Sequence, residues 1–277
     1  MVLSNNSIKN FILVNSFLFI LGLYQYIFIS YCVEIIKNIL IEFLYVFFVF
    51  TTRNYFLLIF IDYGTKGKTR INNNNNSLIP KEEYKYEFHI NVFTSTAVES
   101  ITHTFIKTTF INNFIFSRNI YYEIMYFIPF SFIFEIIFDF FHYFTHRLLH
   151  NKLLYKYLHK KHHKFKHPSS ITTFYQDPID LLITNSIPTV LSLLFFPYLS
   201  YLQFNFIIIY KNFIEISGHS GKKSYPTSSF PQCIWLPKIL HIELYTEEHD
   251  LHHSLNNCNY GKRFSLWDKV FKTYKSS

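Results

Sequence analysis

A stretch of uncharged, apolar sequence near the start of the chain constrains the fold more than any other feature. Residues 11–31 contain no Asp, Glu, Lys or Arg, and they are about long enough for an α-helix to cross a bilayer. The stretch is longer than the core of a signal peptide and no small-residue cleavage site follows it, which indicates a retained membrane anchor. Further apolar stretches follow at 39–61, 120–141 and 181–216.

The composition also favours a membrane protein. Only 16% of the residues are charged, whereas 49% are hydrophobic and 21% are aromatic; an average soluble domain has about 25% charged residues. Glu42 and Arg53 interrupt the second apolar stretch, which is therefore a weaker or tilted span. Residues 181–216 are long enough for a helical hairpin, which would return the chain to its starting face. We expect an all-α integral membrane protein with about four transmembrane or hairpin helices.

A polar, low-complexity segment divides the apolar stretches. Residues 62–91 include five consecutive asparagines and several lysines, which predicts a disordered loop on the cytoplasmic side. This loop lies within an N-terminal membrane region, residues 1–119, which carries no distinctive motif. The three cysteines are widely spaced and odd in number, which predicts neither a disulfide framework nor a cysteine metal site.

The positive charge of the chain is local. The formal net charge is +8, and residues 140–176 carry seven Lys or Arg and no Asp or Glu. In a soluble protein this would suggest nucleic-acid binding. Next to apolar spans, and without any nucleic-acid-binding motif, it indicates a cytosolic surface near anionic lipid headgroups.

Histidines are concentrated in the same part of the chain. Ten of the fourteen fall in two patches, Asp139–His167 and His249–His253. Their spacings of three and four residues bring imidazoles onto one face of a helix. Because the hairpin returns the chain to one side of the membrane, the two patches can form one cytosolic, histidine-rich cap. The candidate metal ligands are His142, His146, His150, His159, His162, His163, His219, His249, His252 and His253.

This number of histidines exceeds what one metal ion needs. A catalytic zinc site uses three protein ligands and a water, and the zinc-protease motif HExxH is absent from the sequence. Imidazole suits iron, copper, zinc and nickel alike, so the residues alone predict two ions and leave their identity open. Asp139 and Glu215 precede His142 and His219 by about one turn, and we expect them to orient those imidazoles.

The histidine motifs carry a family resemblance. HYFTHRLLH, YKYLHKKHH, GHSG and HDLHH, followed by WDKVFKTY, resemble the fatty acid hydroxylase/sterol desaturase superfamily over residues 120–275. The stretch from His142 to Phe165 is most similar to the C4-methylsterol monooxygenases. Glu248 departs from the sterol oxidases, which tend to have another histidine there.

The resemblance implies a multi-pass enzyme of the endoplasmic reticulum membrane with a cytosolic, non-haem di-iron centre held by these histidines. Such enzymes use O2 and electrons from NAD(P)H, delivered by a separate cytochrome b5-type donor, to hydroxylate a lipid, here a sterol. Alternatives within the superfamily are C5 sterol desaturation, fatty acyl hydroxylation and alkylglycerol cleavage. A different class of alternative is a non-catalytic metal-binding or haem-binding membrane protein. A transporter is disfavoured because the histidines lie beyond the apolar stretches rather than within them.

Overall fold

The structure, a computed structural model, describes the chain except for residues 1–4, 37, 72–83, 111–118, 197–198 and 224–228. The fold is 74% helical, and no β-strand is present among the described residues, which confirms the all-α expectation. The longer helices are α1 (Asn5–Ile35), α2 (Ile39–Gly64), α3 (Lys85–Phe110), α4 (Ile120–Leu149) and α8 (Tyr201–Gly218). The shorter ones are α5 (Lys152–Leu154), α6 (Pro178–Leu181), α7 (Ile187–Leu193), α9 (Trp235–Ile239), α10 (Thr246–Leu255) and α11 (Leu266–Val270).

Three helices in the described part of the chain are long and apolar enough to cross a membrane, judged by length and composition. They cover Ile8–Tyr31, Ile39–Gly64 and Ile120–Leu149. Large apolar side chains on their outer faces remain exposed, such as Ile20 at 67% and Ile124 at 69%. Exposed apolar surface of this extent is costly in water and favourable in lipid, so the predicted membrane-embedded character is confirmed.

Helix α2 is apolar enough to span despite the two charges that made its sequence look weaker. Glu42 lies 2.6 Å from Lys107, and Arg53 forms an ion pair with Glu99. Both partners come from α3, which packs along α2. Pairing lowers the cost of burying each charge. Helix α3 begins at Lys85, so the helix includes the last part of the predicted loop; residues 72–83 lie outside the described residues.

The stretch over residues 181–216 forms the predicted hairpin. Its first arm is α6, a π-helical turn at Leu182–Ser186 and α7, and its second arm is α8. Helix α8 packs against α1, where Gly22 provides the space: a Cβ there would lie 2.7 Å from the ring of Phe206. The second arm ends beside the histidines, as the first begins there.

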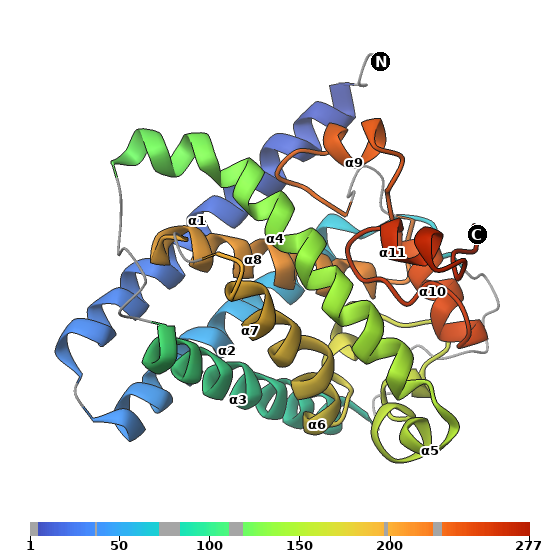
Figure 1. The fold of residues 1–277 in the computed structure, drawn as a ribbon, viewed down its shortest axis with the longest axis horizontal. Coiled ribbons are helices and arrows are strands. Elements are labelled where there is room, and N and C mark those ends of the chain that lie inside the picture. The colour runs from blue at the N-terminus through green and yellow to red at the C-terminus, as the bar shows by residue number, and fades with distance from the viewer. Residues whose placement is uncertain (1–4, 37, 72–83, 111–118, 197–198, 224–228) are drawn as a thin grey trace.

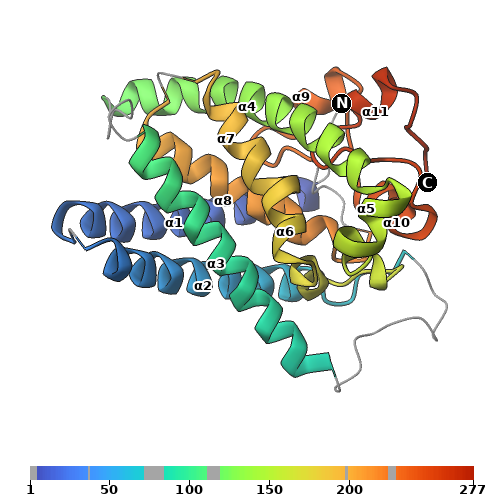
Figure 2. The same cartoon turned by 60° about the horizontal axis from the view of Figure 1, so that its bottom comes forward.

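The helices form an elongated bundle with the histidine-bearing elements at one end. Figures 1 and 2 show α5, α10 and α11 gathered beside the carboxyl end of α4. The start of the 62–91 loop lies at this same end, because the Ile71 amide donates to the carbonyl of Gly221, 3.1 Å away. The described start of that loop and the turn after His219 therefore lie on the same side of the bundle.

Candidate metal centre

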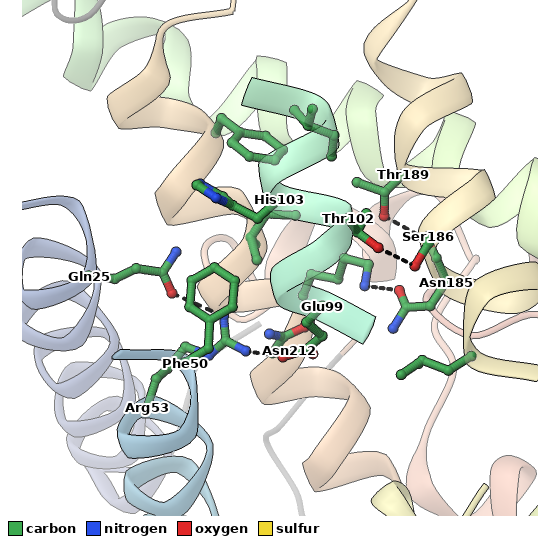
Figure 3. Close-up of a pocket in the computed structure, with 15 residues that line it drawn as sticks. Gln25, Phe50, Arg53, Glu99, Thr102, His103, Asn185, Ser186, Thr189 and Asn212 are labelled. Atoms are coloured by element: carbon green, nitrogen blue, oxygen red, sulfur yellow. Dashed lines mark hydrogen bonds and ion pairs between the residues drawn. The ribbon is translucent and has the colours of Figure 1, made fainter. Parts of the chain in front are cut away.

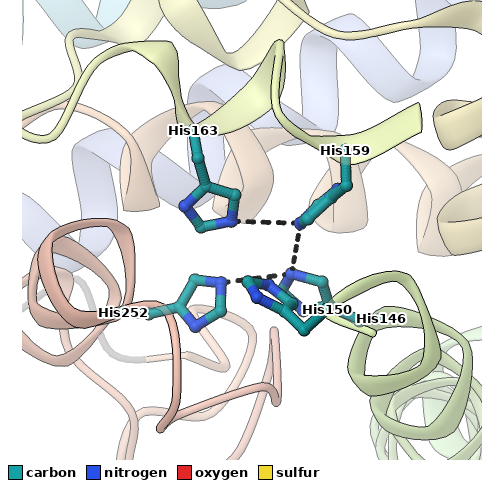
Figure 4. A group of neighbouring side chains, drawn as sticks. All are labelled: His146, His150, His159, His163 and His252. Atoms are coloured by element: carbon teal, nitrogen blue, oxygen red, sulfur yellow. Dashed lines mark hydrogen bonds between the residues drawn. The ribbon is translucent and has the colours of Figure 1, made fainter. Parts of the chain in front are cut away.

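Nine of the ten predicted histidines lie in two compact groups. Within each group, one ligand atom of every member lies within 4.8 Å of one such atom on each of the others. Figure 4 shows the first group, whose side chains converge from α4, the 155–163 turns and α10. The first group consists of His146, His150, His159, His163 and His252. The second group consists of His162, His219, His249 and His253.

The two groups are neighbours, since the rings of His163 and His253 lie 4.6 Å apart between centroids. Each HxxHH motif contributes to both groups. His159 and His163 belong to the first group, whereas His162 belongs to the second. The expectation that all three histidines of a motif share one face is therefore wrong. In the first motif, His159 ends a π-helical turn and His162 begins a 3-10 turn, so the three rings do not follow the spacing of one α-helix. On α10, His252 lies three residues after His249, about 60° around the helix, and its ring belongs to the first group.

Backbone carbonyls orient several of the imidazoles. The Nδ1 of His146 lies 2.8 Å from the Tyr260 carbonyl oxygen, and the Nδ1 of His252 lies 2.6 Å from that of Cys258. A carbonyl oxygen can only accept, so each Nδ1 must carry the proton. In a neutral ring, Nε2 then has a free lone pair, which is the form that binds a metal ion.

The free lone pairs of neighbouring rings face one another. The distances between these nitrogens show whether the rings can bind one metal ion together. The Nε2 of His146 lies 3.1 Å from the Nε2 of His252 and 3.1 Å from that of His159. No proton is available to form hydrogen bonds between the first two rings, so the arrangement is repulsive unless a cation lies between them. Two nitrogens bound about 90° apart, each about 2.1 Å from one ion, would be separated by about 3.0 Å. The donor set therefore fits a metal ion.

In the second histidine group, free Nε2 atoms also lie at distances suited to binding one metal ion. His219 donates from Nδ1 to the carbonyl of Glu215, 2.7 Å away, which leaves its Nε2 free. That Nε2 lies 3.0 Å from the Nε2 of His249 and 3.4 Å from that of His162. Among the described residues, neither ring nitrogen of the buried His253 has a hydrogen-bond partner. Buried polar atoms are rarely left unpaired, so these nitrogens also favour a bound ion.

Burial keeps the histidines uncharged. It lowers the pKa of His219 to about 4 and the pKa of His252 to about 3, outside the membrane spans. It also lowers the pKa of His162 and His249 well below the usual value, with neighbouring histidines adding to the effect. Neutral imidazoles are ready to bind metal without first releasing a proton.

Metal-free protein should lose stability as the pH falls from about 7 to about 5. Histidines of the unfolded chain take up protons below about pH 6.5, whereas His219 stays neutral down to about pH 4. The unfolded state then binds more protons, so each such histidine removes about 1.4 kcal/mol of stability per pH unit. Melting of chelator-treated protein across this range measures the effect. A constant melting midpoint would contradict the prediction, and metal-loaded protein is the control that should resist acid further.

Three predicted residues occupy other positions. His142 belongs to neither group: its Nδ1 lies 2.6 Å from the Thr184 carbonyl, and its ring lies 5.0 Å from that of His146. The Asp139 carboxylate accepts backbone N–H bonds from residues 262–264 rather than orienting an imidazole. For Glu215, the backbone carbonyl contacts His219, whereas the carboxylate binds cations.

Asp180 is a site residue that the sequence analysis missed. It is fully buried, and its Oδ2 lies 2.8 Å from the Nδ1 of His159. Its position in the sequence, 21 residues beyond His159, gives no periodic signal. An acidic residue at the start of an apolar arm was the available hint.

Replacing Asp180 with asparagine should weaken metal binding about 10–100-fold, because partners of metal-bound histidines set ligand orientation and basicity. Asn keeps the shape but not the charge. The control is Asp177→Asn on the same segment: Asp177 caps α6 by accepting from the Ile179 amide at 2.9 Å, and Asn caps equally well. Titration of both variants with metal compares their affinities, and only Asp180→Asn should bind metal more weakly. Unchanged affinity in Asp180→Asn would refute the role.

The fold and the two histidine groups define an all-helical membrane protein with a histidine-rich site able to hold metal ions. The sequence profile described as Fatty acid hydroxylase matches residues 131–273. The chain therefore belongs to the fatty acid hydroxylase family, which agrees with the resemblance at that level.

A curated relative, "Fatty acid hydroxylase vlmA" from Lecanicillium sp, is 41% identical over 69 residues. These residues are 24% of this chain and 19% of the relative, so the chain spans about a fifth of the length of the protein it matches. No solved structure matches the chain.

Proposed function

We propose that the chain is a membrane-bound, non-haem di-iron oxidoreductase that uses O2 to hydroxylate a C–H bond of a lipid. The observation that carries the proposal is the pair of histidine groups, in which bare Nε2 atoms of neutral rings face one another. The family membership supports it, since the family name describes a hydroxylase. Residues 120–275 would form the catalytic domain and residues 1–119 the N-terminal membrane region.

Bound iron would supply O2 activation and oxidation of an unactivated C–H bond, which side-chain acids and bases do not provide. One ion would be held by the first group and the other by the second. Carbonyls of Tyr260 and Cys258 and the carboxylate of Asp180 hold the rings in the metal-binding tautomer. The net reaction consumes lipid, O2, two electrons and two protons, and releases hydroxylated lipid and water.

Metal analysis of the purified protein tests the centre. Two iron ions per chain and no Soret absorption are the expected results. A Soret band would replace the di-iron proposal with the haem-protein alternative. Full metal content without O2 consumption in the presence of reductant and lipid extract would favour the non-catalytic alternative.

For the substrate, we propose a sterol that is oxidised at a C4 methyl group. The stretch from His142 to Phe165, which resembles the C4-methylsterol monooxygenases, supports this choice. Fatty acyl hydroxylation is the second candidate, because the curated relative carries that name. Lipid profiles of cells lacking the protein separate the two. Accumulated 4-methylsterols select the sterol reaction, whereas unchanged sterols with depleted hydroxylated acyl chains select the second candidate.

We place the enzyme in the endoplasmic reticulum membrane with its metal centre on the cytosolic side, where it takes electrons from a separate cytochrome b5-type donor fed by NAD(P)H. Lys152, Lys156 and Lys160 are exposed beside the first histidine group and could dock an acidic donor. Lys161 is engaged inside the fold, since its ammonium donates to the Asn91 side chain at 2.6 Å. Charge reversal at Lys156 and Lys160 should slow turnover with the donor protein but not with a small chemical reductant.

A further inference from the structure

A cavity lies among α1, α2, α3, α7 and α8, and no residue of either histidine group lines it. Figure 3 shows side chains of α1, α2, α3 and α7 around it, and α8 completes the wall. The wall combines apolar groups such as Phe50 and Phe204 with polar groups from Thr102, His103 and Ser186. About 50 Å³ is open to the centres of water-sized molecules, well above the roughly 10–15 Å³ that one water needs. It can hold the end of a ligand, but not a whole lipid.

The cavity adjoins the metal centre through one stretch of chain. On the segment from α6 to α7, Asp180 and Thr184 contact the histidines, while Leu181, Asn185 and Ser186 line the cavity. A π-helical turn over Leu182–Ser186 joins these positions, and such turns are frequent at functional sites.

Two smaller cavities continue toward the histidines. One of them shares Glu99, Leu181 and Asn212 with the cavity described above and reaches Glu215. The second shares Glu215 and is lined by His219 and His249 of the second histidine group. Neighbouring cavities that share lining residues thus extend from the first cavity to the second histidine group.

The charged groups of the wall are already paired. Arg53 forms an ion pair with Glu99 and donates to Gln25 at 3.0 Å. Lys211 donates to the Asn185 side chain and lies 3.6 Å from Glu215. A carboxylate or phosphate headgroup would bring a charge without a free counter-charge, which is costly in a buried site. The cavity therefore favours an uncharged ligand.

One polar atom of the wall lacks a partner. His103 is 5% exposed, and its Nε2 lies 2.8 Å from the hydroxyl of Tyr201. Its Nδ1 is buried without a hydrogen-bond partner among the described residues. Depending on the tautomer, this Nδ1 donates or accepts, and a hydroxyl group can satisfy either requirement.

We propose that this cavity binds the hydroxyl-bearing end of an uncharged lipid, with His103 as the hydrogen-bonding partner of the hydroxyl. We expect the ligand to arrive from the bilayer, because α1 and α2, which are long and apolar enough to cross a membrane, form part of the cavity wall. The identification of this lipid as the substrate rests on the proposed function; the binding site itself does not. The substrate class then narrows to lipids that carry a free hydroxyl, such as a sterol or a long-chain alcohol.

Binding of matched probes to the metal-loaded, full-length protein in nanodiscs tests the proposal. One pair is 1-octadecanol and its methyl ether, and the other is cholesterol and its methyl ether. In at least one pair the alcohol should bind about tenfold more tightly. The added methyl group of the ether crowds the polar wall in either tautomer of His103, and the ether has no O–H to donate where Nδ1 accepts. The pair that discriminates shows whether a sterol or an alkyl chain is held. No binding, or equal binding within both pairs, overturns the proposal.

His103→Phe should abolish the preference for the alcohol. The matched control is His89→Phe on the same helix, which also breaks a His–Tyr hydrogen bond, 2.7 Å to Tyr55, but lies away from the cavity. Preference for the alcohol that survives in His103→Phe overturns the proposal.

If His103→Phe fails to fold, Thr189→Leu provides the second test. The Thr189 hydroxyl donates to the Asn185 carbonyl in the preceding π-helical turn, and the larger leucine side chain would fill part of the cavity. Alcohol binding should fall about tenfold, and unchanged binding would count against the site. Because these assays need no turnover, alcohol binding without any lipid oxidation would refute the proposed function alone. Oxidation without hydroxyl-dependent binding would refute the cavity proposal alone.

Discussion

Replacing His252 with alanine should abolish lipid oxidation and remove iron from the first histidine group. His252 is fully buried, and its Nε2 lies 3.1 Å from that of His146. Loss of a partner that merely orients a ligand costs about 10–100-fold in metal affinity or activity, so loss of the ligand should cost at least about 100-fold. Iron per chain should fall from about two toward one, measured on folded protein.

His162→Ala should produce the corresponding loss in the second group, since His162 contacts His219 through Nε2 atoms 3.4 Å apart. The matched control is His89→Ala, because His89 lies on α3 outside both groups. The control should retain iron and the ability to rescue cells that lack the protein. Full activity and two irons in either the His252 or the His162 variant would refute the proposed centre.

The sequence predicted the helices that carry histidines more accurately than the arrangement of the rings. The four-residue spacing agrees with α4, which contains His142 and His146 and is capped at its carboxyl end by His150. His159 ends a π-helical turn and His162 begins a 3-10 turn, so no single α-helix carries that motif. Short helical turns depend on tertiary contacts, which periodicity does not report.

The groups that orient the histidine rings could not be predicted from the sequence either, because they also depend on tertiary contacts. The carbonyls of Tyr260 and Cys258 are backbone atoms, and every residue has one. Which carbonyls contact a histidine is determined by how the segment after α10 packs against α4. The sequence indicated which carboxylates lie near the site but not what they do there. The Asp139 carboxylate accepts hydrogen bonds from backbone amides and so connects α4 to the 262–264 turn.

The role of Glu215 was also not predictable from the sequence. Its contacts in the structure predict a large loss of stability when its charge is removed. Its buried carboxylate forms an ion pair with Lys262 and lies 3.6 Å from Lys211 and 3.7 Å from Arg263. Burial alone would raise the pKa of Glu215, but these three cations hold it below its usual range. The carboxylate thus compensates positive charge inside the protein, whereas its backbone carbonyl orients His219.

Replacing Glu215 with glutamine should lower the free energy of unfolding by about 3–5 kcal/mol, the usual cost of leaving buried charge uncompensated. The backbone bond to His219 survives the change, so iron per folded chain should stay near the wild-type value. Denaturant unfolding in detergent measures the stability, with Asp62→Asn at the exposed end of α2 as the control.

A double variant separates charge compensation from packing at this position. Lys211→Met removes one of the three cations while keeping a long, apolar side chain of similar length. Combined with Glu215→Gln it should recover part of the lost stability, because less uncompensated charge remains buried. If the double variant is less stable than Glu215→Gln alone, the carboxylate does not act through Lys211. Loss of iron at unchanged stability would instead return Glu215 to the role of orienting an imidazole.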